Sequence, residues 1–528
     1  MLAVLIVMGL FAGCSGNKPA AGSQSETTQS ADNSGGKMFS KTITLKWMLQ
    51  EQSTQKISLD SPVIQAIYDK LNVKLELQPV PASDFVAKKA STLASNTMPD
   101  LMSNMSVEDM RKYSDTGMLL CINDYEAAAP DYFKLVNAGD RINETKKFES
   151  DGKMYGFQTL EYNRIGIAPI NAIRIDLLKE QNIATPTTWA EFYDALVKIK
   201  AKHPEMTGFS SRRGTNYMLG QYAYSMGTGG FPGFDTERGM YYEPNSDSYV
   251  YGPTDAKFTR VVAFMAQAYK DGILDPDYAT MNKDKMFEKL SNGTMISVCD
   301  NNSFIGRVYN PALAKVSPGA SFDIVAPLAD EDGKVRSLRY NKDWFSTDFT
   351  LISSKVSEPE NVIKFLNWLY TEEGVKITNF GREGIEYDMV DGIPTIKADI
   401  VEQNKNATDP FSAIQSQIGS GYQCFAKYID ESTYKQVSDP IFIEQGKKID
   451  SYTKEGKMSY LPAWPSFTAE QMSRVTALEQ KLSNVFNQEI DKYITGKLSM
   501  NDWAKLVEKL KSQGSEELEA LYNAAHKK

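Results

Sequence analysis

An extended stretch near residue 160 constrains the fold of this chain more than any other part of it. It begins at the turn dipeptide Asp151-Gly152 and continues through an apolar, β-branched run from Ile165 to Ile175. Pro169 interrupts that run, and a proline inside a helix removes a hydrogen bond and clashes with the preceding turn. The run therefore favours extended backbone. We interpret residues 151–181 as a segment that leaves one compact lobe and enters another.

Size and charge set further limits. The chain has 528 residues, and single hydrophobic cores stop growing beyond about 250–300 residues, so two or more lobes are expected. The net charge of −9 argues against nucleic-acid binding. It also disfavours a strongly anionic ligand, unless a local basic pocket overrides the global charge. The only histidines are His203 and His526, which nearly excludes a histidine-based metal or catalytic cluster.

The N-terminal residues have the pattern of a lipoprotein signal. An apolar run from Leu2 to Leu10 is too short to span a membrane and is followed by Phe11-Ala12-Gly13-Cys14. We predict that residues 1–14 form the signal peptide and that Cys14 is lipidated. Residues 15–40 are rich in small and polar residues and are predicted to form a disordered tether with a root-mean-square span of roughly 25 Å. An ordinarily cleaved secretory signal or a buried N-terminal helix is the alternative.

Alternating strand and helix patterns begin after the tether. Residues 43–48 alternate as a strand, 62–71 have helical spacing, and 73–80 read as a second strand, which indicates an α/β lobe. A later apolar strand at 294–299 places Asp300 and Asn301 at its carboxyl end, where open α/β sheets bind ligands. Residues 345–353 are a candidate return strand to the first lobe. The Gly227–Gly230 stretch lacks the Gly-Lys-Ser/Thr of a phosphate loop, and we expect a surface loop there.

Several short motifs resemble a known family. They are Gly152-Lys153-Met154-Tyr155-Gly156, Ile173 to Leu178, Pro186 to Phe192, and Asn379 to Gly384. Together they are similar to the extracellular solute-binding lipoproteins of carbohydrate ABC importers, family 1, in its long Gram-positive branch, and more distantly to maltose-binding proteins. The resemblance implies an α/β, two-lobed periplasmic-binding-protein-like fold of type II, with the ligand cleft between the lobes.

The resemblance also implies a function and an arrangement of the chain. It implies a monomer, lipid-anchored at the outer face of the plasma membrane, that delivers an oligosaccharide or other sugar to ABC permease subunits and has no enzymatic activity. The expected parts are 41–160 and 345–430 in lobe 1, 161–344 in lobe 2, and 431–528 as C-terminal helices, mostly in lobe 2. Many relatives carry a calcium loop after the helix that ends near Lys202. Residues 203–208 lack the oxygen ligands for it, so we predict no calcium and no cofactor.

Candidate ligand-binding residues follow from the chemistry of sugars. Aromatic rings stack on sugar C–H faces, while amides and carboxylates pair with hydroxyls. The candidates near predicted strand ends or loops are Trp47, Glu51, Asn104, Tyr162, Asn163, Arg164, Tyr222, Asp300, Asn301, Trp344 and Trp464. The polar ones have a competing interpretation as turn or cap residues. Trp189, Trp368 and Trp503 lie within helical patterns, and we expect them in the core.

Two other functions remain open from the sequence. A secreted glycoside hydrolase or lyase would need two carboxylates at a fixed separation, and 67 acidic residues make some such pair unavoidable by chance. No local catalytic motif supports that reading. A binder of peptides or other small solutes would share the same fold. Cys121, Cys299 and Cys424 have no metal-binding spacing and are expected to be small buried hydrophobes, with their pairing left open.

Overall fold

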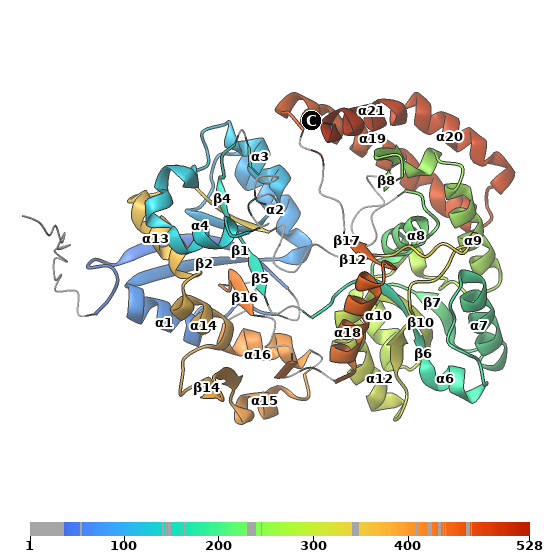
Figure 1. The fold of residues 1–528 in the computed structure, drawn as a ribbon, viewed down its shortest axis with the longest axis horizontal. Coiled ribbons are helices and arrows are strands. Elements are labelled where there is room, and N and C mark those ends of the chain that lie inside the picture. Colours follow the sequence, from blue (N-terminus) through green and yellow to red (C-terminus); the bar gives the residue numbers. More distant parts are fainter. Residues whose placement is uncertain are drawn as a thin grey trace, which may run out of the picture.

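Two α/β lobes lie side by side in the computed structural model, which describes most of the chain after residue 35 (Figure 1). Cys14, Asn163, Arg164, Trp344, Trp464 and Cys424 lie outside the described residues. Those described are 36–527, apart from 53–54, 140–141, 143–144, 146–148, 151, 163–164, 230–238, 244, 340–347, 408, 420–424, 431–434, 437, 439, 461–464 and 466.

Lobe 1 is built on a five-stranded sheet of order β2-β1-β3-β13-β4. β1 pairs in parallel with β2 and β3, whereas β13 is antiparallel to β3 and β4. The strands are β1 (Ile43–Glu51), β2 (Val73–Pro81), β3 (Leu101–Met105), β13 (Phe349–Ile352) and β4 (Gly156–Gln158). The helices are α1 (Pro62–Leu71), α2 (Ala82–Ala94), α3 (Val107–Ser114), α4 (Pro130–Val136), α13 (Pro359–Trp368), α14 (Glu372–Phe380), α15 (Ala398–Asn404) and α16 (Pro410–Ile418).

The predicted strand–helix–strand opening of lobe 1 is confirmed. Helix α1 begins where predicted because the Ser61 side chain accepts a hydrogen bond from the backbone N–H of Ile64, and Pro62 occupies the first helical turn. Its apolar face, including Val63 and Ile67, is buried in the lobe 1 core. The return of the chain to this lobe is also as predicted, because β13 lies within residues 345–353.

Lobe 2 is built on a four-stranded sheet of order β11-β6-β10-β7. All six residues of β6 are buried, as expected for a strand covered on both faces. The strands are β11 (Phe322–Ile324), β6 (Pro169–Arg174), β10 (Met295–Asn301) and β7 (Thr207–Ser210). Helices around this sheet include α6 (Ile175–Glu180), α7 (Trp189–Lys202), α8 (Gly214–Ser225), α9 (Phe258–Lys270), α10 (Lys283–Ser291), α12 (Asn310–Val316) and α18 (Pro440–Lys454).

The C-terminal helices complete lobe 2. α19 (Ala469–Ile494), α20 (Trp503–Ser512) and α21 (Ser515–His526) run along one side of it, drawn in red in Figure 1. Leu482 and Leu506 belong to the same buried cluster as residues of α7 and α9. Trp189, Trp368 and Trp503 are buried, so the prediction that these three tryptophans are core residues is confirmed.

Short paired segments connect the lobes. β5 (Leu160–Tyr162) follows β4 and pairs in parallel with β16 (Tyr428–Asp430), and β12 (Leu338–Arg339) pairs in parallel with β17 (Ser459–Tyr460). The chain thus passes between the lobes after β4, before β13 and after β16. Neither pair belongs to the sheet of either lobe.

The expectation of a surface loop at 227–230 is wrong for its described part. Gly227, Thr228 and Gly229 are buried after α8, and a Cβ on Gly229 would lie 2.1 Å from Gly252 Cα. Backbone packs directly against backbone there, which only glycine permits. Cys121 and Cys299 are free thiols, half-buried and buried respectively. No helix within the described ranges is both long and apolar enough to span a bilayer.

Close packing of α18 on the entry to β6 generates a testable prediction. A Cβ on Gly446 would lie 2.2 Å from Ile165 Cγ2, and one on Gly166 would lie 2.5 Å from the Gly446 carbonyl oxygen. Alanine is the better helix former by about 1 kcal/mol. We nevertheless expect Gly446→Ala to lower the free energy of unfolding by roughly 1–3 kcal/mol, because the new methyl group overlaps Ile165.

Denaturant unfolding measures the effect of Gly446→Ala. Lys447→Ala, on the exposed side of the same helix, is the matched control and should stay within about 0.5 kcal/mol of the parent. A Gly446→Ala protein as stable as the parent, or more stable, would contradict this packing.

Candidate functional site

One edge of the lobe 1 sheet faces the segments that connect the lobes. β4 ends at Gln158 immediately before the chain leaves the lobe, and β13 begins at Phe349 as the chain returns. Phe349 pairs with both Gln158 and Met105, so the carboxyl end of β3 lies at this edge. β1 is parallel to β3, which brings its last residue, Glu51, to the same side. We call these strand ends the lobe 1 edge.

An equivalent edge exists in lobe 2. β6 begins at Pro169 as the chain arrives from lobe 1, and Pro169 pairs with Asn301 at the end of β10. β7 is parallel to β10, with Ser210 opposite Val298. Arg212 lies in the turn just after β7, where its side chain contacts Asp300 of β10. We call these strand ends the lobe 2 edge.

The lobe 2 edge holds a buried ion pair. Asp300 is 1% exposed. Its Oδ1 accepts a hydrogen bond of 2.7 Å from the backbone N–H of Asn301, and its Oδ2 accepts one from the Tyr309 hydroxyl. The same Oδ2 lies 2.7 Å from Arg212 Nε. Both carboxylate oxygens are thus occupied by protein groups, which suits a role in positioning Arg212.

Electrostatics at this pair keep Arg212 and Tyr309 protonated. Burial opposes the charged form of Arg212, but Asp300, Tyr309 and Tyr217 together outweigh it and raise the pKa of the guanidinium. Burial, and then Asp300, also raises the pKa of Tyr309 well above its ordinary value. Tyr309 consequently keeps its proton and acts as a donor to the carboxylate.

Cations and aromatic rings surround the pair. The Arg212 guanidinium lies over the Phe304 ring, 3.9 Å from its centroid, and Lys283 Nζ lies 5.8 Å from the centroid of the same ring. Such stacking is the geometry of a cation–π contact. Burial, and then the positive charge of Arg212, lowers the pKa of Lys283. The lobe 2 edge is therefore locally cationic, although the chain as a whole is acidic.

An ion pair joins the two lobes beside this cluster. Arg307, in the π-helical turn η4 (Ile305–Tyr309) of lobe 2, places Nη2 2.8 and 3.0 Å from the two oxygens of Asp409. Asp409 caps α16 of lobe 1, where it also accepts hydrogen bonds from Ser412. The side chains of Arg307 and Asp409 are 12% and 8% exposed. The lobe 2 edge thus faces lobe 1.

Three predicted site residues lie at the lobe 1 edge or on the connection. Glu51 accepts hydrogen bonds from Lys56 Nζ (2.8 Å) and from the backbone N–H of Ile57 (3.1 Å). Asn104, at a backbone φ of 58°, accepts one of 3.1 Å from the N–H of Gln50. Tyr162, on β5, packs against Tyr428 with ring centroids 4.5 Å apart. Burial, and then Asp430, raises the pKa of Tyr162.

Asn301 lies at the lobe 2 edge beside Asp300. Its Oδ1 accepts a hydrogen bond of 2.7 Å from the hydroxyl of buried Tyr217. The structure thus brings Glu51 and Asn104 to one edge, Asp300 and Asn301 to the other, and Tyr162 to the connection between them.

Two further candidates lie in the lobe cores. Trp47 is fully buried, its indole N–H donates to Ser103 Oγ at 2.8 Å, and its ring packs against Phe365 and Phe425. Tyr222 is fully buried, with its ring centroid 4.1 Å from that of Trp189. Neither ring is available for stacking on a ligand, so both leave the candidate set.

Sequence reasoning missed the cationic residues of the lobe 2 edge. The available signal was the position of Arg212 soon after the short strand at 207–210, much as Asp300 comes directly after 294–299. Lys283, Phe304 and Arg307 carry no such signal, because they reach the edge from α10 and from helical turns after β10.

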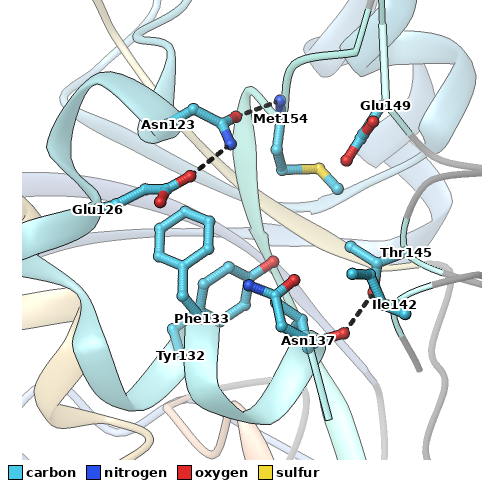
Figure 2. A pocket seen from close by; sticks show the side chains of 10 residues that line it. Asn123, Glu126, Tyr132, Phe133, Asn137, Ile142, Thr145, Glu149 and Met154 are labelled. Carbon is cyan, nitrogen blue, oxygen red and sulfur yellow. Dashed lines mark hydrogen bonds between the residues drawn. The ribbon is translucent and has the colours of Figure 1, made fainter. Parts of the chain in front are cut away.

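A small pocket lies in lobe 1 (Figure 2). Its volume is about 140 Å³, below the roughly 300–1,000 Å³ of typical ligand pockets. Met154, which precedes β4, lines it, and Asn123 bridges the Met154 N–H (2.7 Å) and Glu126 (3.0 Å). The pocket is therefore too small for an oligosaccharide.

Metal chemistry finds no support among the residues described. They contain no group of three or more His, Cys, Asp or Glu side chains that could hold a metal ion. At 203–208, the Lys200 ammonium donates to the carbonyl oxygens of Pro204, at 2.8 Å, and Met206. A protein cation thus occupies these carbonyls, while the absence of calcium stays a prediction.

Comparisons with known proteins agree with the two-lobed architecture. The family model described as bacterial extracellular solute-binding protein matches residues 52–376. Lipoprotein LipO of Bacillus subtilis (strain 168) is 24% identical, over 98% of this chain and 96% of LipO. The polygalacturonan/rhamnogalacturonan-binding protein YtcQ of the same organism is 23% identical, over 99% and 97%. The crystal structure of alginate-binding protein AlgQ2 without calcium ion has a TM-score of 0.74 at 19% identity, over 93% and 99%.

The ion pair between the lobes yields the second prediction. Arg307→Gln or Asp409→Asn leaves one nearly buried charge without its partner, so each should lower the free energy of unfolding by roughly 3–5 kcal/mol. The double variant should lose clearly less than the sum of the two, because the charges are removed together. Denaturant unfolding of all four proteins measures this cycle.

Arg260→Gln is the control for the cycle. Arg260 pairs with Glu331 at 3.4 Å, and the two side chains are 48% and 74% exposed, so its loss should cost roughly 0–1 kcal/mol. Strictly additive effects of Arg307→Gln and Asp409→Asn would show that the two charges do not interact.

Proposed function

Because the chain belongs to the family of bacterial extracellular solute-binding proteins, we propose that it captures an oligosaccharide between its two lobes and delivers it to an ABC importer. Members of that family are binding proteins, so the chain is not an enzyme and the hydrolase or lyase reading is set aside. The observation that carries the proposal is the family match, which covers every strand that builds the two edges except β1.

A saccharide is the class of solute that the other observations favour. One relative is named for binding polygalacturonan and rhamnogalacturonan, and a solved structure of the same fold is an alginate-binding protein. In this chain, amide, carboxylate and aromatic side chains meet at the edges that face each other across β5 and β16. Sugars offer hydroxyls to the first two and C–H faces to the third.

The proposed contacts come from both lobes and from the connection. Asn104 and Glu51 would supply acceptors and donors from lobe 1, Tyr162 an aromatic ring from β5, and Asn301 with Arg212 polar groups from lobe 2. Asp300 would act through Arg212, since its own oxygens are occupied. Asn163, Arg164, Trp344 and Trp464 remain proposed contacts, on their sequence positions alone.

We further propose that the protein is a monomer held at the outer face of the plasma membrane by a lipid on Cys14. A relative of similar length is a lipoprotein, and the apolar run before Cys14 has the corresponding pattern. The two acyl chains of a diacylglyceryl group would suffice for stable anchoring.

Anchoring is tested by Cys14→Ala. In Gram-positive cells supplied with a functional signal sequence, the variant should appear in the medium or accumulate unprocessed, because the thiol that accepts the lipid is gone. Fractionation and immunoblotting measure the distribution, with Cys121→Ala, a half-buried thiol of the folded part, as the control that should stay at the membrane. A Cys14→Ala protein that is processed and retained would contradict lipidation at this residue.

Ligand binding between the lobes is tested by a panel of neutral and acidic oligosaccharides, with peptides as controls. A bound saccharide should raise the free energy of unfolding by about 2.7 kcal/mol at a concentration of about 100 Kd. It should also reduce the radius of gyration in solution scattering, because a ligand that contacts both lobes favours hinge closure. Stabilisation by peptides alone would overturn the proposal, and binding at an unchanged radius would contradict closure.

A further inference from the structure

We propose that Arg212 binds a carboxylate of the ligand, so that the saccharide captured between the lobes is an acidic one that carries uronic-acid groups. This inference rests on the proposed function, because it takes the ligand to be a saccharide bound at the two edges. A guanidinium presents its donors as a planar fork that matches the two oxygens of a carboxylate, and buried or half-buried arginines are used for such recognition.

Arg212 is held rigidly by contacts that leave this fork available. Its Nε lies 2.7 Å from Asp300, and the face of the guanidinium lies 3.9 Å from the centroid of Phe304. The side chain is only 11% exposed. Within the described parts of the chain, the two terminal nitrogens make no hydrogen bond to protein. These donors are therefore available to a group from outside the protein, either water or a ligand.

Other arginines of lobe 2 use their terminal nitrogens differently. Arg174 places Nη2 2.6 Å from Asp176, Arg336 places Nη1 3.0 Å from Asp330, and Arg339 places Nη1 2.9 Å from Asp450. Each of these terminal nitrogens pairs with a carboxylate of the chain, as in an ordinary structural ion pair. The Arg212 atom closest to Asp300 is Nε, and no carboxylate among the described residues is hydrogen-bonded to its terminal nitrogens.

The surroundings of Arg212 favour an anion over a neutral group. Lys283 lies over the same Phe304 ring, and the positive charge of Arg212 adds to burial in lowering its pKa. Two cations thus lie over this ring, and one carboxylate, that of Asp300, contacts Arg212. A carboxylate placed there gains from both cations in a partly desolvated site, where charges interact more strongly than in water. The net charge of −9 is carried elsewhere on the chain.

The first test needs no variant. Trigalacturonic acid and its fully methyl-esterified form have the same rings, but only the acid carries charge. Isothermal titration calorimetry of the parent protein should show the acid binding at least about tenfold more tightly than the ester, the expected scale for charge-assisted hydrogen bonds. The affinity of the acid should fall as salt is added, because salt screens the ion pair. Equal affinities for acid and ester would overturn the inference.

Variants then identify the residue. Arg212→Gln should weaken binding of the acid at least about tenfold, and clearly more than it weakens binding of the ester. Arg212→Lys keeps the charge without the fork, so its affinity for the acid should lie between those of Arg212→Gln and the parent. Arg260→Gln makes the same change in net charge at an exposed position of lobe 2 and should bind like the parent. Unchanged acid binding by Arg212→Lys and Arg212→Gln would overturn the role of Arg212.

Circular dichroism confirms that each variant is folded before titration. If Arg212→Gln fails to fold because buried Asp300 loses its partner, Arg212→Lys and the comparison of acid with ester still decide the question. Neutral oligosaccharides that bind more tightly than trigalacturonic acid would overturn this inference and leave the proposed function intact. A chain that binds no saccharide, neutral or acidic, would overturn both.

Discussion

A backbone segment that leaves one lobe for the other cannot form its hydrogen bonds within either sheet. In the parallel ribbon of β5 and β16, backbone N–H and C=O groups are paired between the lobes instead. The N–H of Leu160 donates to the carbonyl of Lys427 at 2.7 Å in this ribbon. Buried backbone groups need such partners, so this passage is a paired segment. β4 ends just before this ribbon and β6 begins after it, so both sheets have strand ends next to the connection. Every residue of the candidate site depends on that arrangement.

Electrostatics at the lobe 2 edge follow from burying one carboxylate. Asp300 is almost fully buried, and an ionised group in that position requires donors. A backbone N–H, a phenol and a guanidinium provide them, and the guanidinium is oriented as a consequence. Arg307 reaches across to Asp409 from the same side of lobe 2. Opposite charges thus hold the lobes together beside the position where the ligand is proposed to bind.

Local periodicity predicted most elements because it reports which faces are buried. The strands expected at 43–48 and 294–299 are present as β1 and β10, and the two-lobed α/β fold is confirmed. The interpretation of Trp47 as a residue near a strand end failed for a specific reason. β1 continues to Glu51, so Trp47 lies in mid-strand and faces the core. The predicted strand end was three residues too early, and for that reason a core residue was interpreted as a ligand-stacking residue.

The sequence by itself determined the α/β alternation, the existence of two lobes and the placement of polar residues such as Asp300 and Asn301 after a buried strand. These features depend on the order of residues along the chain, because a strand end is local and burial leaves a periodic pattern. Only the tertiary structure decided that Arg212 meets Asp300 and that Arg307 meets Asp409, 102 residues away in sequence. Ion pairs depend on distance and burial, and both arise when distant segments pack together.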